Sequence, residues 1–426
     1  MRRRVLQVLI GLFLVAVGAI LFFSMRPVGT PPPTRSYPPN NAYDQLKEVA
    51  GRYVKSHKRD PVMRNIVLQR LNAPSGVEVV LSESDYRQLT QKYGVFLQEY
   101  ARHLQTPCIA VFEYNFEYNP KYPMEELVWF RDLARLEEWL MRYELQQGRE
   151  QQAVQRFVRL LQFSSQISQD GTLIHHLVGT AIRAQARAPL LAHQVHHPQS
   201  LRTVLQAVQQ FESNRIPLMK AFEHERLLAE ANYYRLHRAT WREFKAVFNL
   251  QDESFLTVLR MRLSLRPAYR EFQTLAEKPL NELRKPLWER DVSALPLPQH
   301  PLNSEHIWFK DNSWINREAE DVAHLRLLGV LCAVRLHKHR TGNYPRTLDE
   351  LGLGEMVIDP YTGKPFVYRV DPLKGFQLYS VGSNRVDDGG RILKRRHFNQ
   401  DLGDIAPYIS GPGISSEPLS APVWFR

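Results

Sequence analysis

The sequence predicts a mainly α-helical protein with a small α+β domain near its C-terminus and one transmembrane helix near its N-terminus. Three observations predict this class. Between residues 42 and 295, apolar residues recur every three or four positions, the period of helices that bury one face. After residue 342, short alternating segments lie between Gly, Pro and Asp turns, as strands of a hairpin do. An uncharged apolar run at residues 5–23 is the third observation.

Length and charge limit the classes of protein that the chain can belong to. Its 426 residues exceed one typical domain, and 43% of them are hydrophobic, as in globular proteins. The net charge of +12 favours anionic neighbours such as nucleic acid, acidic polysaccharide or anionic lipid. The arginines are scattered along helices that also carry glutamate, and no dense basic and aromatic patch or nucleic-acid motif occurs. We therefore expect no nucleic-acid partner.

Residues 1–25 have the pattern of a cytoplasmic tip followed by a membrane anchor. The run 5–23 has 19 residues and no charge, and at about 1.5 Å per residue it matches a hydrocarbon core of ~30 Å. Arginines at positions 2–4 precede it, so the positive-inside rule places the N-terminus in the cytoplasm. A cleaved signal peptide is the alternative, but the run is long and no A-x-A-like site follows. We expect an uncleaved signal anchor and a periplasmic body.

Residues 26–41, RPVGTPPPTRSYPPNN, are rich in proline. Proline favours extended polyproline geometry, which makes such a segment a semi-rigid spacer. We expect a stalk that holds the rest of the chain off the bilayer.

Residues 42–295 are expected to form an irregular helical bundle or a short solenoid. Gly148 is placed to end one helix and to open a helical hairpin, which is weakly similar to a tetratricopeptide unit, although no such repeat recurs. Further helices are expected at 173–188, 201–211 and 217–237. The apolar stripe before Gly148 comprises Leu127, Phe130, Leu133, Leu136, Leu140 and Tyr143.

Two segments interrupt the helical pattern. Residues 108–123 are aromatic and β-like, so we expect a short hairpin or a strapped loop there. Residues 277–305 contain repeated prolines and are not expected to form one regular helix, since proline lacks a backbone donor and clashes with the preceding turn. This stretch overlaps the predicted linker between domains, residues 296–315.

Histidines in the helical region raise the hypothesis of an envelope hydrolase. His193 and His197 are four residues apart and share a helix face if one helix covers both, the spacing that zinc binding needs. The site would also include His175 and Glu223. However, the chain has no HExxH, GxSxG, Walker A or GxGxxG motif. We therefore expect ordinary polar helix positions and a protein that is not an enzyme.

The two cysteines, Cys108 and Cys332, do not form a recognisable metal or redox motif, because neither lies in a CxxC or His–Cys zinc spacing. One disulfide is possible in an oxidising compartment. Cys332 lies among apolar residues of a helix, where a thiol behaves as a small hydrophobic group. We expect two separate buried thiols.

Residues 316–405 predict a small α+β module. A helix over 316–340 ends at Gly342, the usual position of a C-terminal glycine. Thr347 and Glu350 have the spacing of a capping box that starts a one-turn helix. The alternating segments around residues 366–370 and 376–381 then predict an antiparallel hairpin.

The order of GNYPRTLDEL, DPYTGKPFVYR, GFQLYSVGSN and DDGG resembles the globular part of the major pseudopilin of type II secretion systems, in the type IV pilin class. It is similar also to a module that follows a helical region in uncharacterised bacterial membrane-anchored proteins. The resemblance covers residues 316–405, under a quarter of the chain. It implies a helix with an antiparallel hairpin and a place at the cell envelope.

The same resemblance implies a calcium site, because the pseudopilin binds calcium in the loop after its second strand. Clustered oxygen donors suit Ca²⁺. The sequence departs from the family pattern at Asn384, at Arg385 and in the basic segment 391–400, whose cations oppose a metal ion. The alternative is a turn in which the aspartates cap backbone N–H groups. The matching acidic residues are Asp387, Asp388, Asp401 and Asp404.

The two ends of the chain differ from those of a pilin. A prepilin has Gly-Phe and then a glutamate directly before its hydrophobic helix, and the sequence MRRRVLQVLIG lacks that pattern. We therefore expect neither prepilin processing nor packing as a filament subunit. Residues 406–426 form a Pro/Gly/Ser-rich tail, which is expected to be extended and to dock through Trp424 and Phe425.

The leading functional hypothesis is a non-enzymatic, single-pass membrane protein that works as an interaction partner or scaffold for proteins of the cell envelope. One alternative is an accessory component of a secretion or pilus system, which rests on the module alone. The other is the envelope hydrolase around the histidines.

Overall fold

The computed structural model describes residues 28–58, 60–72, 81–112, 124–193, 195–291, 297–303, 313–390, 404–405 and 425. This part of the chain is mainly helical and carries one small antiparallel hairpin. The α-helices are α2 (Ala42–His57), α3 (Pro61–Asn72), α4 (Glu83–His103), α5 (Glu125–Gln146), α6 (Glu150–Ser168), α7 (Leu173–His193), α8 (Pro198–Ser213), α9 (Leu218–Arg238), α10 (Trp241–Val247), α11 (Phe255–Leu263), α12 (Leu265–Arg284) and α14 (Ser313–Thr341). The strands are β1 (Val367–Asp371) and β2 (Gly375–Tyr379).

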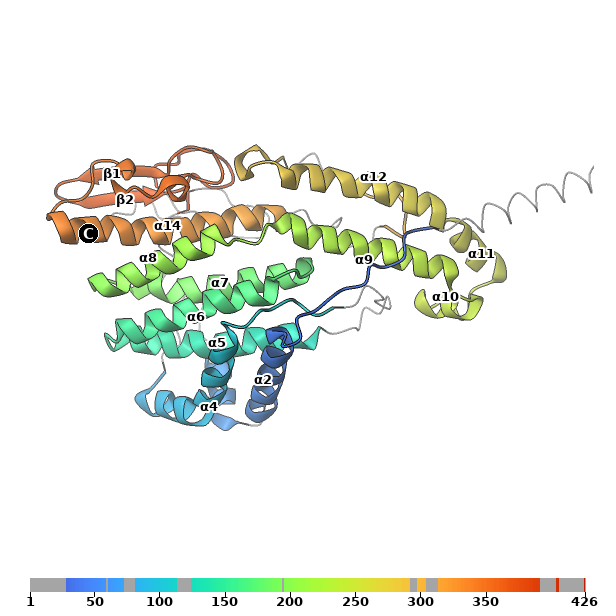
Figure 1. Cartoon of the computed structure of the whole chain (residues 1–426), viewed down its shortest axis with the longest axis horizontal. Helices are drawn as coiled ribbons and strands as arrows, with labels where there is room; N and C mark the ends of the chain where they lie inside the picture. Colours follow the sequence, from blue (N-terminus) through green and yellow to red (C-terminus); the bar gives the residue numbers. More distant parts are fainter. Residues whose placement is uncertain are drawn as a thin grey trace, which may run out of the picture.

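The helices α5, α6, α7, α8 and α14 form the centre of the molecule, with α2 and α4 on the far side of α5 (Figure 1). α5, α6 and α7 pack against one another, and α8 packs against α6 and α14. Their apolar faces share one core, which also takes in residues of α2 and α4. Every member of the stripe predicted before Gly148 is buried in it. The predicted helical hairpin is confirmed as α5 and α6, which Gly148 separates with a φ of +69°. This left-handed backbone suits glycine, which has no Cβ to clash.

Helices α9 to α12 form a second packed group at one end of the molecule, with its own buried core (Figure 1). Phe244, Val258 and Phe272 lie in that core, as do Trp314 and Ile315 from the start of α14. The second core therefore joins this group to the central helices through α14 as well as through the contact of α7 with α9.

Two helices contain a proline in their interior, and one of them, α7, extends beyond its expected end. Helix α7 continues past residue 188 through Pro189 to His193, and α12 continues through Pro279 to Arg284. Residues 277–305 do not form one regular helix, as expected, because α12 ends at Arg284 and a separate 3₁₀ turn, Leu287–Glu289, follows it. Pro279 is buried on the amphipathic face of α12, and packing of that face offsets the backbone donor that proline lacks.

Residues 28–41, which we call the strap, lie along the body of the molecule rather than standing away from it as a free stalk (Figure 1). The Thr30 hydroxyl donates to Glu230 of α9 at 2.8 Å. At the other end, the Asn41 side chain donates to the carbonyl oxygen of Ile109 at 2.8 Å and accepts from the Ile109 amide at 2.9 Å. The expectation of a spacer is thus wrong for these residues, because polar groups of the body satisfy the strap's side chains.

The module consists of α14, two short 3₁₀ turns and the hairpin. β1 and β2 pair in antiparallel register, with Tyr368 opposite Leu378. Ile405 and Phe425 each form a bridge to the outer edge of β2, opposite Ser380 and Phe376. The expectation that the tail docks through Phe425 is confirmed, since this residue is 4% exposed; Trp424 lies outside the described residues.

The first 3₁₀ turn, Leu348–Leu351, lies where a one-turn helix was expected, but the expected capping box is absent. The carboxylate of Glu350 accepts from the amide of Arg346 instead of that of Thr347, at 3.1 Å. The Thr347 side chain makes no capping hydrogen bond.

The segment 108–112 is without a strand, and the rest of the predicted aromatic hairpin lies outside the described residues.

Helix α14 belongs to both the helical body and the module. Leu325, Leu328 and Cys332 face the central core, whereas Leu327 and Val330 face the core of the module. α14 also has extensive contacts with α8 on the body side. Of the predicted linker, residues 296–315, the structure describes 297–303 and 313–315, and the last three of these already belong to α14.

No helix in the described ranges is both long and apolar enough to span a membrane. The predicted anchor, residues 5–23, lies outside those ranges.

Candidate functional site

The acidic loop that follows β2 was the candidate calcium site. Asp387 accepts hydrogen bonds from the Tyr379 hydroxyl at 2.7 Å, from Arg369 at 2.9 Å and from the Gly389 amide at 2.9 Å. Burial tends to raise the pKa of Asp387, but these hydrogen bonds and the Arg369 charge hold it below its usual range. The Asp387 carboxylate therefore already accepts three hydrogen bonds from the protein itself.

Asp404 brings the distant end of the loop back to Asp388. Its carboxylate accepts from the Gly390 amide at 2.6 Å and from the Asp388 amide at 3.3 Å. Burial raises the pKa of Asp404 to about 6, and the charges of Asp387 and Asp388 add to this rise. Asp388 in turn accepts from the side-chain amide of Asn384 at 2.9 Å.

The geometry matches the turn that was weighed against the calcium site, because each of these carboxylates accepts a hydrogen bond from the protein. Asp401 lies outside the described residues. Within the described ranges, no group of three or more His, Cys, Asp or Glu side chains is placed to hold a metal ion. Calcium binding at Asp387, Asp388, Asp401 and Asp404 stays a prediction.

Asp359 was missed by sequence reasoning and holds two motifs of the module together. It begins DPYTGKP, and its side chain accepts from the amide of Tyr361 at 2.9 Å within that turn. Its second oxygen accepts from the amide of Val381, in YSVG, at 3.0 Å. Asp359 is 1% exposed, and burial raises its pKa. Only the tertiary contact with Val381 distinguishes it from an ordinary turn aspartate.

His175, the first of the candidate hydrolase residues, is fully buried and engaged through both ring nitrogens. Nε2 lies 3.0 Å from the Tyr43 hydroxyl, and Nδ1 accepts from the Thr172 amide at 3.3 Å. Burial lowers the pKa of His175 to about 3, and the charges of Arg35 and His224 lower it further. It is therefore a neutral core histidine, held by α2 and by the turn before α7.

His193 and His197 lie in different elements, so the condition for a shared helix face, one helix that covers both, is not met. Helix α7 ends at His193, and His197 is the N-cap of α8, where its side chain accepts from the Gln199 amide at 3.3 Å. The chain leaves the helical path between them because Pro198 starts a new helix. Glu223 is half-buried on α9, apart from this junction.

Glu225, two residues after Glu223 on α9, makes a contact with another helix. Glu225 points to the start of α7 and accepts from the Leu173 amide at 3.0 Å, where a carboxylate satisfies a free helix donor. Burial raises the pKa of Glu225 to about 7. Arg226, the next residue, approaches Glu230 one turn further along α9, at 3.5 Å.

The strap meets the body at a cluster that sequence reasoning also missed. Arg35 donates to the carboxylate of Asp170 at 3.1 Å and to its carbonyl oxygen at 2.9 Å. Nε2 of His224 lies 2.9 Å from the Asp170 carboxylate. The Arg35 guanidinium lies 3.4 Å from Nδ1 of the same ring. The central carbon of the guanidinium also lies over the Phe112 ring, 4.0 Å from the ring centroid. Asp170 has a φ of +53°, which presents both its carbonyl and its side chain to Arg35.

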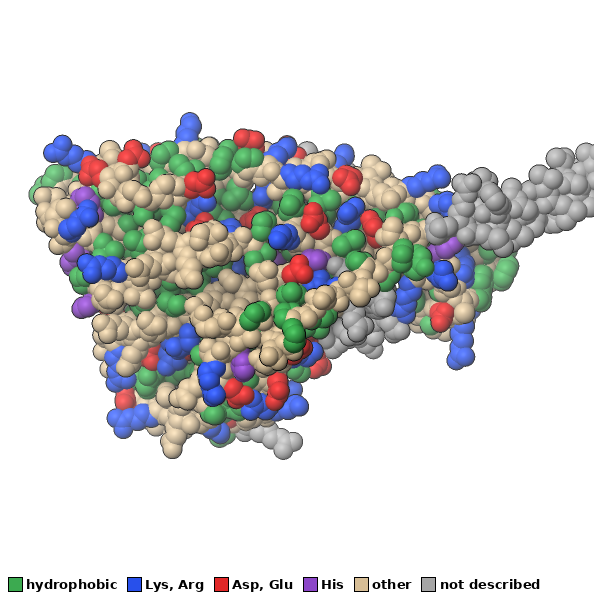
Figure 2. Space-filling view, in the orientation of Figure 1, with side chains coloured by type: hydrophobic (Ala, Val, Ile, Leu, Met, Phe, Trp, Pro, Cys, Tyr) green, Lys and Arg blue, Asp and Glu red, His purple; other side chains and the backbone are tan. Residues whose placement is uncertain are grey.

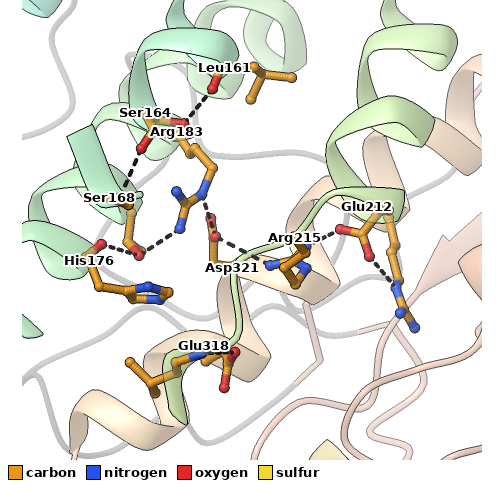
Figure 3. A network of polar contacts seen from close by, with 12 residues as sticks. Leu161, Ser164, Ser168, His176, Arg183, Glu212, Arg215, Glu318 and Asp321 are labelled. Carbon is orange, nitrogen blue, oxygen red and sulfur yellow. Dashed lines mark hydrogen bonds and ion pairs between the residues drawn. The ribbon is translucent and has the colours of Figure 1, made fainter. Parts of the chain in front are cut away.

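A buried network of arginines and carboxylates joins α14 to α7 and α8 (Figure 3). Asp321, 2% exposed, accepts from Arg183 Nε at 2.7 Å and from Arg187 at 3.0 Å. Arg215 lies 3.9 Å away on the segment after α8. Burial alone raises the pKa of Asp321, but the three arginines outweigh it and hold the pKa below its usual range.

The network continues from both ends of this cluster (Figure 3). On one side Glu212 pairs with Arg215 and accepts from Arg326 of α14 at 3.0 Å. On the other side Glu318 accepts from the Leu218 amide at 3.2 Å and pairs with Arg290. The contacts therefore fix α14 to α7, α8, α9 and the segment after α12.

Cys108 and Cys332 are separate, buried free thiols, as expected. Burial raises the pKa of each to about 12, which keeps both protonated and weakly nucleophilic near neutral pH.

The fold and these sites define a helical protein whose polar clusters hold chain segments together. No family model, curated protein or solved structure matches the chain.

Proposed function

We propose that this chain is a single-pass, membrane-anchored protein that works outside the cytoplasm as a scaffold or interaction partner for other envelope proteins. The observation that carries the proposal is the uncharged run at residues 5–23, joined within a few residues to a strap that is docked on the body. An anchor connected in this way holds the body close to the bilayer in a defined orientation.

The polar clusters support a scaffold more than an enzyme. Arg35 joins the strap to the turn between α6 and α7 and to α9. Asp321 joins α14 to α7, and Asp359 joins two parts of the module. Asp321 is a buried charge paired with two arginines, and such a pair holds segments in register. His175 has both ring nitrogens engaged, and His193 and His197 are on different elements, so the hydrolase hypothesis loses the geometry that motivated it.

The pseudopilin-like module favours a second candidate, an accessory role in a secretion or pilus system. The specific observation is that α14 packs along a hairpin whose edge is completed by Ile405 and Phe425. The opposite face of α14 is covered by the body, which favours an accessory component over a filament subunit.

The anchor is tested by membrane extraction of the full chain. It is expected to stay in the membrane pellet at alkaline pH, and Leu14→Arg with Val17→Arg is expected to release it. Protease added outside spheroplasts is expected to digest the body. A body that is released from wild-type membranes, or that is protected from the protease, contradicts the proposal.

The scaffold role is tested with a photo-crosslinking residue at Val370, which is 41% exposed on β1. A discrete adduct to one envelope protein is expected, with the same residue at the buried Val330 as the control. The accessory role requires that the adduct contain a secretion or pilus component. Repeated absence of any adduct in membranes that retain the full chain counts against both roles.

A further inference from the structure

The end of the molecule formed by α10 and α11 exposes bulky apolar side chains. Phe255 and Leu256 are each 64% exposed, and Leu263 is 45% exposed. Trp241 stacks on the ring of Phe255, with the ring centroids 4.9 Å apart. Single exposed apolar residues are ordinary, whereas adjacent large ones around an aromatic pair form a patch that marks an interaction surface.

The same end carries an excess of positive charge. Between residues 235 and 270 the sequence has eight Lys and Arg against three Asp and Glu, so this short segment holds a large share of the net charge of +12. Arg242 and Arg260 are exposed, and basic and hydrophobic side chains share this end of the surface (Figure 2). Tryptophan and phenylalanine beside arginines are typical of surfaces that lie at a membrane interface.

The described strap begins at this end of the molecule. Val28 is buried in the core that also contains Phe244 of α10 and Val258 of α11. Gly29, with a φ of +80°, lies against α9, and a Cβ there would be 2.5 Å from the Tyr234 amide, in the last turns of that helix. The strap then runs from here along α9 toward α2 (Figure 1).

Covalent geometry limits how far this end can be from the predicted anchor. Phe23 ends the uncharged run and Val28 begins the described strap. Five residues reach at most about 18 Å when fully extended. If residues 5–23 cross a bilayer, its surface lies within that reach of Val28, at the end of the molecule that carries the apolar and basic patch.

We propose that the patch formed by α10 and α11, residues 241–263, rests on the membrane surface, with Phe255 and Leu256 in the interface and the arginines against anionic lipid headgroups. This inference rests on the proposed membrane anchor. The excess of positive charge between residues 235 and 270, most of which flanks the patch on α9 and α12, favours anionic headgroups over a second copy of this chain. The corresponding end of a second copy carries the same charge and would be repelled. The patch and the anchor together give two attachments, which fix the tilt of the body relative to the bilayer.

The test uses the full chain in vesicles that contain anionic phosphatidylglycerol. An environment-sensitive fluorophore is attached to Leu256→Cys and, as the control, to Leu373→Cys, which lies in the turn between β1 and β2 and is 85% exposed. The native thiols are buried, and the unsubstituted chain measures their labelling. A nitroxide on the lipid headgroup is expected to quench the Leu256 label several-fold more than the Leu373 label, and the emission of the Leu256 label is expected to shift to the blue.

Flotation of the same vesicles separates the two proposals. If the chain does not float with the vesicles, the anchor fails, and with it the proposed function. If the chain floats but both labels are quenched equally, the anchor stands and the membrane-facing patch is wrong. A third outcome would also overturn the inference. If the Leu256 label is shielded from water equally in detergent micelles and in vesicles, and the lipid nitroxide does not quench it, a protein covers the patch instead of the membrane.

A charge variant tests the electrostatic part of the inference. Arg242→Gln with Arg260→Gln is expected to reduce quenching of the Leu256 label severalfold in anionic vesicles while flotation is unchanged. Arg87→Gln, an exposed position on α4, is the matched control and is expected to leave the quenching as it was. Equal quenching in the double variant and the control would contradict the role of anionic headgroups.

Discussion

Phe376 and Phe425 exchange both of their backbone hydrogen bonds, with N···O distances of 2.9 and 2.7 Å. Their rings lie 5.4 Å apart, and Phe425 is buried in the core of the module. A residue near the end of the sequence thus completes the edge of the hairpin, and a two-stranded hairpin alone is marginally stable in water.

Phe425→Ala is expected to destabilise the module by about 3 kcal/mol, because a buried aromatic ring and its contacts are removed. Leu373→Ala, at the exposed tip of the hairpin, is the control and is expected to change stability by less than about 0.5 kcal/mol. Hydrogen exchange at the Phe376 amide measures the effect directly. An unchanged exchange rate in Phe425→Ala would show that the pairing does not stabilise the hairpin.

Asp321→Asn is expected to lower the free energy of unfolding by about 3–5 kcal/mol, because it leaves Arg183 and Arg187 buried without their carboxylate. Chemical denaturation of the full chain in detergent measures the loss. Glu48→Gln breaks an exposed pair with Arg52 and is expected to cost no more than about 1 kcal/mol. Similar losses in the two variants would contradict the importance of the buried network.

The buried histidines predict a loss of stability in acid. Burial lowers the pKa of His175 to about 3 and that of His176 to about 4, so below about pH 6.5 the unfolded chain binds protons that the folded chain does not. Stability is therefore present above the unfolded pKa and falls as the pH is lowered toward these values.

Each histidine is expected to contribute a loss of about 2 kcal/mol between pH 6.5 and 5, as one proton corresponds to about 1.4 kcal/mol per pH unit. His175→Gln is expected to reduce the slope, although it also removes part of a buried contact. Leu373→Ala, at the exposed and uncharged tip of the hairpin, is the control and is expected to keep the slope of the wild type. Unfolding curves at several pH values check both, and an unchanged slope in His175→Gln is the contrary result.

Asp404 predicts a dependence of opposite sign. Its pKa of about 6 in the folded chain is above the unfolded value of about 3.9, so the folded chain keeps a proton that the unfolded chain releases. The stability that this proton contributes is fully present below about pH 4 and is lost as the pH rises through about 6. Asp404→Asn is expected to remove this part of the pH dependence in thermal melts, and a variant that keeps the wild-type profile refutes the assignment.

Calcium provides a separate test of the same loop. If Asp387, Asp388, Asp401 and Asp404 bind Ca²⁺, millimolar calcium is expected to raise the melting temperature, since a ligand that binds only the folded chain stabilises it. Asp388→Asn is expected to abolish the rise. Magnesium is the control, because it demands tighter octahedral geometry. A melting temperature that calcium leaves unchanged removes the calcium site.

Much of the local structure could be predicted because it depends on neighbours in the sequence. The stripe from Leu127 to Tyr143 has the period of one helix face, and Gly148 and Gly342 end helices where a left-handed residue is needed. The strands of the hairpin followed from alternation and turn residues. The capping box failed because Glu350 had two amides within reach and sequence spacing does not choose between them.

The candidate sites were harder to predict because they depend on contacts between distant residues. The pair of His193 and His197 assumed one continuous helix, whereas Pro198 begins a new one. Sequence reasoning offered no reason to connect Arg35 with Asp170 or Asp359 with Val381. A possible signal was Asp359 itself, a turn aspartate followed by a proline, although such residues are common in ordinary turns.

The sequence by itself determined the helical period, the turns of the module, the absence of a metal motif in the cysteines and the expectation of an anchor at residues 5–23. These properties are set within one helical turn, one hairpin or one apolar run. The tertiary structure alone decided that Asp321 accepts from Arg183, 138 residues away in the sequence, that the strap lies on the body and that Phe425 closes the hairpin. A buried charge or an open strand edge is unfavourable without a partner. Only the tertiary structure decides which residue is that partner.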